Sequence, residues 1–206
     1  MKQSKVIGIT GSIAAGKSTV CSYLEEKYGV RRLDADKTGH EVITRPEVVK
    51  ELTKAFGKAI LDSAGVVNRK ALGSIVFADP HKLQLLNQIT HPVICDEIRC
   101  RIQEFRQNPD APIFMLEAIE LLRTPLKDMV EENWVVWADD EVRVQRIMKR
   151  QNLDEQEARN RVQSQWSQEN YKAAADVLID GGGTVEELHE ALDRLMERMY
   201  GKEDHT

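Results

Sequence analysis

The chain has 206 residues, of which 41% are hydrophobic and 31% charged, and its formal net charge is −5. This length favours one domain with small insertions over several domains. The acidic balance argues against a protein that coats DNA or RNA. No run of about 18 apolar residues occurs, so the sequence predicts no membrane-spanning helix.

The three cysteines, Cys21, Cys95 and Cys100, are odd in number and lack CxxC spacing. We therefore expect neither a disulfide framework nor a structural zinc site. The first apolar run follows Met1 closely and is too short for the hydrophobic region of a signal peptide. We therefore expect a cytoplasmic protein.

The first elements are predicted to be a strand, a loop, a helix and a second strand. An apolar run over residues 5–10 predicts a buried strand. Residues 17–28 predict a helix, because Val20 and Leu24 recur on one face. A short strand is predicted over 30–33. This order of elements is typical of a parallel α/β sheet.

The rest of the chain is predicted to be mostly helical, with three further strands. We expect His91-Pro92 to interrupt a long helical region. The helices are predicted over 46–56, 69–77, 80–86, 93–105, 141–150, 154–170 and 184–199, and the strands over 113–116, 134–138 and 177–179. These elements indicate one compact α/β domain with helical insertions.

A phosphate-binding loop, or P-loop, follows the first strand. Its motif, G-x-x-x-x-G-K-[ST], is matched without a gap by Gly11, Ser12, Ile13, Ala14, Ala15, Gly16, Lys17 and Ser18. In such loops backbone N–H groups and a helix N-terminus surround a phosphate chain, the lysine reaches the β- and γ-phosphates, and the serine binds Mg²⁺. The motif predicts a nucleoside-triphosphate site. The alternative is a glycine-containing turn with a solvated lysine.

The P-loop alone does not distinguish GTPases, motor ATPases and small kinases. The guanine-reading motif Asn/Thr-Lys-x-Asp is missing, and no aliphatic strand ends in Asp-Glu. A small-molecule kinase is the class that remains.

Two carboxylates follow the second strand, in Asp34-Ala35-Asp36. Alternate residues of an extended segment point to the same side, and ligands of open α/β sheets bind at the carboxyl ends of strands. A carboxylate there could orient or deprotonate an acceptor hydroxyl. In the alternative interpretation, Asp34 caps a helix and Asp36 is solvated.

A basic segment lies near the C-terminal third of the chain. Arg143, Arg146 and Arg150 share a helix face, and Arg159 and Arg161 follow. These arginines could belong to a lid that binds the transferring phosphoryl group and excludes water. They could equally form a solvated face with intrahelical ion pairs.

Isolated histidine and tryptophan residues are weaker signals. His91 alone is more often structural than a ligand contact, and Trp134, Trp137 and Trp166 are expected to pack rather than to stack on a nucleobase. Met115 and Met148 are expected in the core.

The order of the motifs over about residues 5–190 resembles the dephospho-CoA kinase family. The most discriminating string is Leu86-Asn87-x-Ile89-x-His91-Pro92, which has no counterpart in adenylate or shikimate kinases. The other motifs are Gly11–Ser18 with Thr19, Asp34-Ala35-Asp36, Gly65-x-x-Asn68-Arg69-x-x-Leu72 with Val76-Phe77, Glu117-Ala118-Ile119, Arg146-x-x-x-Arg150, Arg161 with Gln165, and Asp176-x-x-Ile179-Asp180.

The resemblance implies a P-loop kinase fold, with a five-stranded parallel sheet flanked by helices, a helical acceptor-binding insertion and a lid. The single kinase domain would comprise a core of about 1–36, 111–140 and 174–206, an acceptor-binding part of about 37–110 and a lid of about 141–172. The implied reaction transfers the γ-phosphate of ATP to the ribose 3′-hydroxyl of dephospho-CoA and completes coenzyme A biosynthesis. Mg²⁺ is the implied cofactor.

The resemblance also implies roles for individual residues. Asp36, Lys17 and Arg150 would be catalytic, with Asp36 as the base on the acceptor hydroxyl. The loop from Gly11 to Thr19 would bind ATP together with Arg150. The acceptor would contact Asp34, Asp36, Arg69, His91 and Glu117, and Mg²⁺ would be bound by Ser18 and also Asp34.

ATP and dephospho-CoA are the expected partners, with no nucleic acid and no membrane. A monomer or a weak homo-oligomer is expected. Two other hypotheses stay open: a kinase for another small hydroxylated metabolite, and a nucleotide-dependent switch that phosphorylates nothing.

Three positions depart from the pattern of the family. Ser12 stands where a second glycine is usual, Arg123 stands where an acidic residue is expected, and Asp180 replaces an asparagine. Glu120 could substitute for the acidic residue, or that contact is lost. Each departure concerns one contact and leaves the class of protein unchanged.

Overall fold

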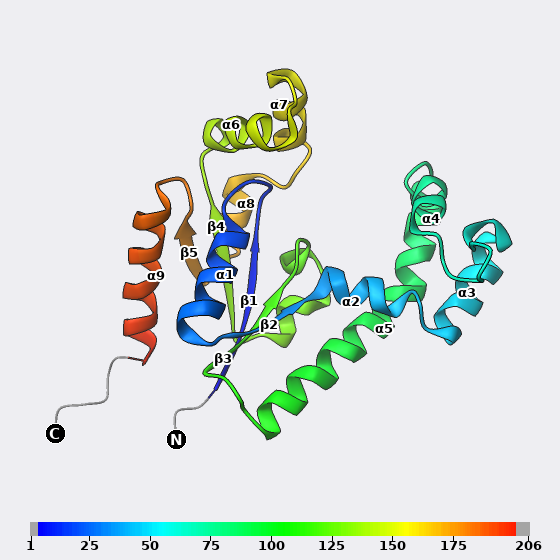
Figure 1. Cartoon of the computed structure of the whole chain (residues 1–206), viewed down its shortest axis with the longest axis horizontal. Helices are drawn as coiled ribbons and strands as arrows, with labels where there is room; N and C mark the ends of the chain where they lie inside the picture. The colour runs from blue at the N-terminus through cyan, green and yellow to red at the C-terminus, as the bar shows by residue number, and fades with distance from the viewer. Residues whose placement is uncertain (1–3, 201–206) are drawn as a thin grey trace. The chain divides into compact units, whose positions relative to one another are not determined.

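The computed structural model describes residues 4–200 (Figure 1). The chain divides into two compact units. The first contains the described residues up to Leu33 and from Phe105 onward, and the second contains Asp34–Glu104. Within the described residues, no helix is long and apolar enough to cross a membrane.

The first unit is built on one five-stranded sheet with strand order β2-β3-β1-β4-β5. The central strand β1 runs parallel to β3 and β4, and β4 runs parallel to β5. The strands are β1 (Lys5–Gly11), β2 (Arg31–Asp34), β3 (Ile113–Glu117), β4 (Glu132–Trp137) and β5 (Val177–Asp180). The predicted five-stranded parallel sheet is confirmed. All five residues of β3 are buried, as expected for an inner strand of a parallel sheet covered on both faces.

Helices of the first unit cover the sheet and extend from it. They are α1 (Lys17–Tyr28), α6 (Asp140–Gln151), α7 (Glu155–Gln163), α8 (Gln168–Ala173) and α9 (Val185–Tyr200), with two short 3₁₀ turns, η2 (Leu121–Arg123) and η3 (Pro125–Met129).

The single helix predicted over 154–170 is wrong, because the structure has two helices there. The first ends at Gln163, and Ser167 caps the second by accepting a hydrogen bond from the Asn170 amide at 3.3 Å. Between them, Trp166 packs edge-on against Tyr171, at 5.3 Å between ring centroids. A serine cap and an aromatic contact therefore override the continuous helical pattern.

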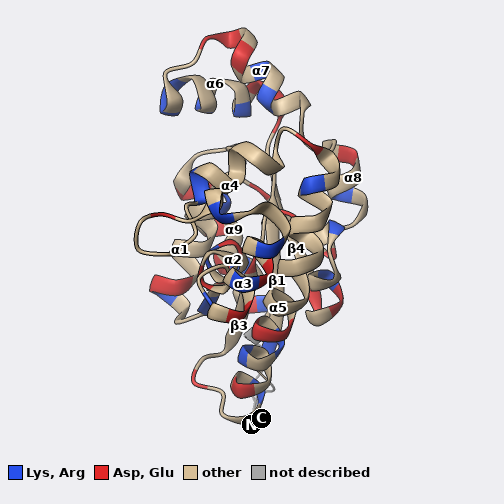
Figure 2. Cartoon of the chain, turned by 90° about the vertical axis from the view of Figure 1, so that its right-hand side faces the viewer, with Lys and Arg blue, Asp and Glu red and all other residues tan. Residues whose placement is uncertain are grey.

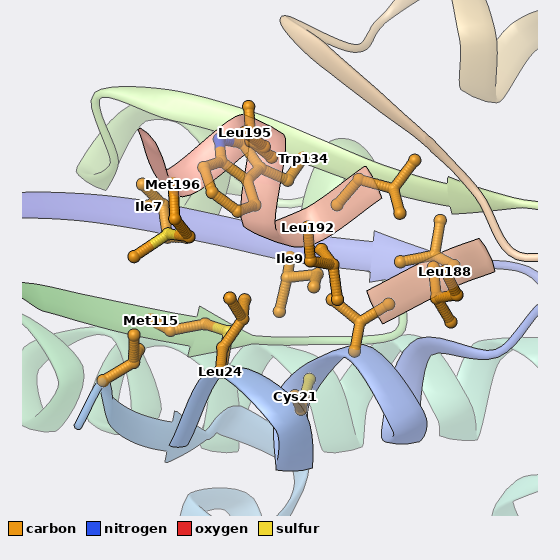
Figure 3. Close-up of a cluster of buried hydrophobic side chains, with 14 of the residues drawn as sticks. Ile7, Ile9, Cys21, Leu24, Met115, Trp134, Leu188, Leu192, Leu195 and Met196 are labelled. Atoms are coloured by element: carbon orange, nitrogen blue, oxygen red, sulfur yellow. The ribbon is translucent and has the colours of Figure 1, made fainter. Parts of the chain in front are cut away.

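The core of the first unit lies where α1 and α9 meet the sheet. Ile9, Leu24, Trp134 and Leu192 are fully buried in one cluster (Figure 3). The predicted packing role of Trp134 is confirmed, and Met115 lies in the same cluster.

The thiol of Cys21 belongs to this core. Burial, with a smaller contribution from the nearby Glu117 charge, raises the pKa of Cys21 to about 12. The thiol therefore stays protonated and unreactive at neutral pH, as expected for a packing residue. Cys95 and Cys100 are also free, the first partly buried and the second exposed.

The second unit is helical. Its elements are α2 (Ala35–Val42), α3 (Pro46–Phe56), the 3₁₀ turn η1 (Lys58–Ile60), α4 (Arg69–Val76) and most of α5 (Pro80–Gln107). Its own core contains Val42, Leu52, Ile60, Leu72 and Val76. Asn68 caps α4, because its side-chain oxygen accepts from the amides of Lys70 and Ala71 at 3.1 Å.

The predicted interruption at His91-Pro92 is wrong, because α5 continues through Pro92. A proline inside a helix loses one hydrogen bond and crowds the preceding turn. Here the exposed Pro92 lies on the solvent side, while Ile89 and Val93 pack against the core of the second unit. Burial of this apolar face outweighs the local cost of the proline.

We predict that Leu192→Ala destabilises the first unit by about 3 kcal/mol, because it leaves a cavity in a fully packed core. Urea denaturation of the full chain, followed by tryptophan fluorescence, measures the loss. Val185→Ala is the matched control on the same helix: its side chain is exposed, so the cost should stay below about 0.5 kcal/mol. Equal losses in both variants would contradict the packing assigned to α9.

Candidate active site

The P-loop connects the carboxyl end of β1 to the first turn of α1. Gly16 precedes the helix with φ 106° and ψ 8°, a backbone conformation that side chains rarely adopt. No side chain caps the N-terminus of α1. The Thr19 amide donates to the Gly16 carbonyl at 3.0 Å, so the amides nearest the start of the helix are the ones that an anion could reach, and the helix dipole favours a negative charge there.

The loop after β5 lies directly against the P-loop. A Cβ at Gly181 would be only 2.0 Å from the Ala15 carbonyl oxygen. Only glycine permits this approach of two backbones. Asp180, which replaces the expected asparagine, shapes the same turn by accepting a hydrogen bond from the Gly182 amide at 2.8 Å.

Lys17 is held by a buried carboxylate at the carboxyl end of β3. Its Nζ forms an ion pair with Glu117 Oε1, and Arg32 binds the other carboxylate oxygen at 2.7 Å from Nε and 2.5 Å from Nη2. Arg32 Nη1 also contacts Glu25 at 2.9 Å. Glu117 is only 5% exposed. One buried anion therefore lies between two cations.

The charge state of Glu117 follows from its neighbours. Burial by itself raises the pKa of this carboxyl group, but hydrogen bonds and charges from Lys17 and Arg32 outweigh burial and lower the pKa overall. Glu117 is therefore ionised at neutral pH. Arg32 belongs to none of the sequence motifs. Only the strand order, which puts β2 next to β3, brings its side chain to Glu117.

Two arginines of α6 donate hydrogen bonds to backbone carbonyls of the P-loop. Arg143 is 1% exposed, and its Nε donates to the Ile13 carbonyl at 3.1 Å while Nη1 pairs with Asp140 at 2.8 Å. Arg146 Nη1 donates to the carbonyls of Ala14 at 3.2 Å and Gly181 at 2.7 Å. These guanidinium groups bind the backbone of the loop, a role that the helical spacing alone did not predict.

Other charges of this segment form surface pairs. Arg159 lies 2.7 Å from Glu155 and 2.8 Å from Glu141, and Arg161 donates to Gln151. Figure 2 shows basic and acidic residues interspersed along α6 and α7. The Arg159–Glu155 pair fits the solvated-face interpretation, with an ion pair within one helix, whereas Arg161 contacts an uncharged side chain of α6. Arg150 is exposed near the end of α6.

In the second unit, Asp34 and Asp36 have different environments. The extended geometry expected for Asp34-Ala35-Asp36 is wrong, because α2 begins at Ala35 and Asp34 caps it. Asp34 Oδ1 accepts from the amides of Asp36 at 2.9 Å and Lys37 at 3.1 Å. Asp36 is exposed in the first turn of the helix. The capping alternative for Asp34 is therefore confirmed, while a catalytic role for Asp36 stays a prediction.

The other predicted acceptor contacts of this unit lie on α4 and α5. Arg69 Nη2 lies 2.5 Å from His40 Nε2 on α2, a partner that the sequence analysis missed. His91 is exposed on α5. Their predicted contact with the acceptor stays a prediction.

The donor groups suit a magnesium ion held mainly by phosphates. Among residues 4–200, no group of three or more His, Cys, Asp or Glu side chains could hold a metal ion by itself. The Ser18 hydroxyl is exposed in the first turn of α1. Mg²⁺ commonly takes one or two protein oxygens and completes its shell with water and substrate phosphates, which fits this arrangement.

Comparison with known proteins identifies the family. A sequence model described as dephospho-CoA kinase matches residues 5–187. The chain belongs to the dephospho-CoA kinase family. A dephospho-CoA kinase of Geobacter sulfurreducens is 38% identical over 196 residues, which cover 95% of this chain and 98% of the relative. One from Staphylococcus aureus is 36% identical, covering 97% of this chain and 99% of the relative. The resemblance deduced from the motifs is confirmed.

Solved structures support the same family and fold. A crystal structure of a Thermus thermophilus protein, TT1252, matches with a TM-score of 0.76 and 30% identity, covering 96% of this chain and 98% of that one. A Campylobacter jejuni dephospho-CoA kinase gives a TM-score of 0.66 and 26% identity over the same shares. Shikimate kinase from Acinetobacter baumannii gives 0.51 at 14% identity, covering 99% and 97%, which shows the common P-loop kinase fold alone.

Two departures from the family pattern have local partners. Ser12 is 3% exposed and lies within hydrogen-bond distance of Gln168, at 2.7 Å. Arg123 forms an exposed pair with Glu120 at 3.1 Å. Glu120 therefore pairs with Arg123, the residue that stands where the family usually has an acidic side chain.

We predict that Glu117→Gln makes the chain less stable by about 2 kcal/mol at pH 7, because it removes charged hydrogen bonds from Lys17 and Arg32. Folding lowers the pKa of Glu117, so its pairs stabilise the chain above the unfolded pKa. This contribution is lost as the pH falls through the lower folded pKa. Denaturation measured from pH 7 to pH 3 should show the difference shrinking below about pH 4.

The matched control is Glu131→Gln, which removes an exposed ion pair with Arg106. It should change stability by less than about 0.5 kcal/mol. A difference between wild type and Glu117→Gln that stays constant down to pH 3 would contradict the charge state assigned to Glu117.

Proposed function

We propose that this chain transfers the γ-phosphoryl group of ATP to the ribose 3′-hydroxyl of dephospho-CoA, giving coenzyme A and ADP. This is the final step of coenzyme A biosynthesis. The observation that carries the proposal is the P-loop with its uncapped helix and Lys17, in a chain that the family model matches over residues 5–187.

ATP is bound by the loop from Gly11 to Thr19. The phosphates accept hydrogen bonds from the open N–H groups at the start of α1. Lys17 exchanges its partner from Glu117 to the β- and γ-phosphates, so the lysine is never without a counter-charge. Arg32 stays on Glu117 and compensates the buried carboxylate when Lys17 leaves it.

Asp36 is the base that accepts the proton of the acceptor hydroxyl. A carboxylate suits this task, because phosphoryl transfer needs an oriented acceptor more than a strong base. Asp34 caps α2 and so holds the turn that carries Asp36. Arg69, His91 and Glu117 contribute to acceptor binding, and Arg150 contacts the phosphoryl oxygens from the lid, about residues 141–172.

Mg²⁺ is the cofactor, bound by Ser18 and with Asp34 as a further candidate ligand. When bound, the ion neutralises charge on the β- and γ-phosphates. Ser18 supplies an oxygen from the first turn of α1. Asp34 uses Oδ1 for capping, and its Oδ2 lies 3.8 Å from the Nζ atom of the exposed Lys37, so a metal ion there would have to replace this lysine.

We propose that the protein works in the cytoplasm as a monomer or weak homo-oligomer, without nucleic acid or membrane as partners. The division into a core, an acceptor-binding part of about 37–110 and a lid is proposed on the same basis.

An acceptor panel tests the reaction. We expect ADP formation, measured with a coupled assay, to require dephospho-CoA and to stop when EDTA removes Mg²⁺. Shikimate and adenosine should give no turnover. Lys17→Ala, purified in the same way, controls for contaminating kinases. Turnover with shikimate or adenosine but none with dephospho-CoA would reject the proposal, and equal ADP formation without any acceptor would favour a nucleotide-dependent switch.

The role of Asp36 is tested by Asp36→Asn. We expect the rate of phosphoryl transfer to fall by about 10²–10⁴-fold, the usual contribution of general base catalysis, with ATP affinity unchanged. Asp96→Asn is the control, because this exposed carboxylate of the same unit pairs only with a neighbour on its own helix in the described structure. A near-normal rate for Asp36→Asn would refute the base assignment.

A further inference from the structure

Two glutamines, Gln165 between α7 and α8 and Gln168 at the start of α8, reach the first half of the P-loop. Gln165 Oε1 accepts the Ile13 amide at 2.7 Å. Gln168 Nε2 donates to Ser12 Oγ at 2.7 Å. Both pairs are more than 150 residues apart in the chain, so only the tertiary fold brings them together.

Gln165 is itself held in place. Arg143 Nη2 donates to its Oε1 at 3.2 Å, while Arg143 Nε donates to the Ile13 carbonyl at 3.1 Å. Ile13 is therefore bound through both its backbone N–H and its carbonyl. Inside the protein such hydrogen bonds are stronger than in water, so this half of the loop is fixed without any nucleotide.

Ser12 adds a polar group that a glycine would not bring. Its side chain is almost fully buried, and a buried hydroxyl without a partner would destabilise the loop. Gln168, the first residue of α8, supplies that partner, and Ser167 anchors the start of α8 through the Asn170 amide. Gln168 Oε1 is also buried and has no hydrogen-bond partner among the described residues, so the contact with Ser12 is the one that orients this amide.

We propose that Gln168 is a positioning residue for nucleotide binding. It acts through Ser12 and holds the first half of the P-loop in the shape that receives the phosphates. By bonding the Ser12 hydroxyl, it lets a serine stand at a position where the family usually has glycine. Gln168 itself touches no substrate in this assignment. The proposal rests on the proposed function in one respect, that the P-loop binds ATP.

Binding of a non-hydrolysable ATP analogue with Mg²⁺, measured by calorimetry without any acceptor, tests the proposal. Gln168→Met keeps the side-chain length but cannot donate a hydrogen bond. We expect its Kd for the analogue to rise about tenfold, as for loss of one buried hydrogen bond. KM for ATP should rise in parallel, while kcat and KM for dephospho-CoA stay within about twofold, which a general loss of structure would not produce.

A double-mutant cycle assigns the effect to the pair. Ser12→Ala should match Gln168→Met, and the double variant should be no weaker than either single variant, because all three lack the same bond. Gln163→Met is the matched control: this exposed residue lines the same cavity of the first unit as Gln168 and should bind normally.

Several results would overturn the proposal. Unchanged affinity in Gln168→Met and Ser12→Ala, or a double variant as weak as the product of the two single effects, would show that the contact does not position the loop. If Gln168→Met fails to fold, the Kd of the ATP analogue is compared between wild type and the variants Ser12→Ala and Ser12→Gly, which remove the same hydrogen bond from the other side. A wild-type chain that binds no nucleotide would reject the proposed function and this inference together, whereas normal wild-type binding with unaffected variants would reject the inference alone.

Discussion

The candidate site depends on one buried carboxylate. Glu117 ends a fully buried strand, and an isolated charge in such a place would be strongly unfavourable. Lys17 from the P-loop and Arg32 from the next strand supply the compensating charges. The same contact holds Lys17 in a defined position at the start of α1. Under the proposed function, Lys17 would leave Glu117 for a phosphate of ATP, and Arg32 would then still compensate the buried carboxylate.

The P-loop is supported by side chains on its outer side as well as by its own sequence. Arg143, Arg146 and Gln165 bind the backbone of residues 13 and 14. Arg143 can be this deeply buried because its guanidinium donates to a carbonyl, a carboxylate and an amide oxygen at once. The segment predicted as a lid therefore has a base attached to the loop and an outer part with a solvated, mixed-charge surface. These bonds physically link the geometry of the loop to the position of this segment.

Sequence patterns misplaced helix boundaries at three places. Pro92 should end a helix, yet α5 continues because the neighbouring apolar residues are buried against the second unit's core. That burial is set by the folded chain, so propensity within a window could not show it. The helical pattern over 154–170 should be continuous, yet Ser167 and Trp166 divide it through contacts with Asn170 and Tyr171. These contacts are local, and so is the Asp34 cap of the short helix α2, which was one of the two interpretations of Asp34-Ala35-Asp36.

The amino-acid sequence by itself determined the class of protein. The unbroken P-loop motif is a local pattern whose chemistry follows from residue type and spacing, and the order of the other motifs carries the resemblance to the family. The alternation of strands and helices predicted a parallel α/β sheet, and the resemblance implied that it has five strands. The strand order β2-β3-β1-β4-β5 came only from the structure. Only the tertiary structure decided which charges neutralise one another. Lys17 pairs with Glu117, Arg143 with the Ile13 carbonyl and Ser12 with Gln168, and the two members of each pair lie 100 or more residues apart in the chain. Such pairings depend on burial and strand order, which no local pattern encodes.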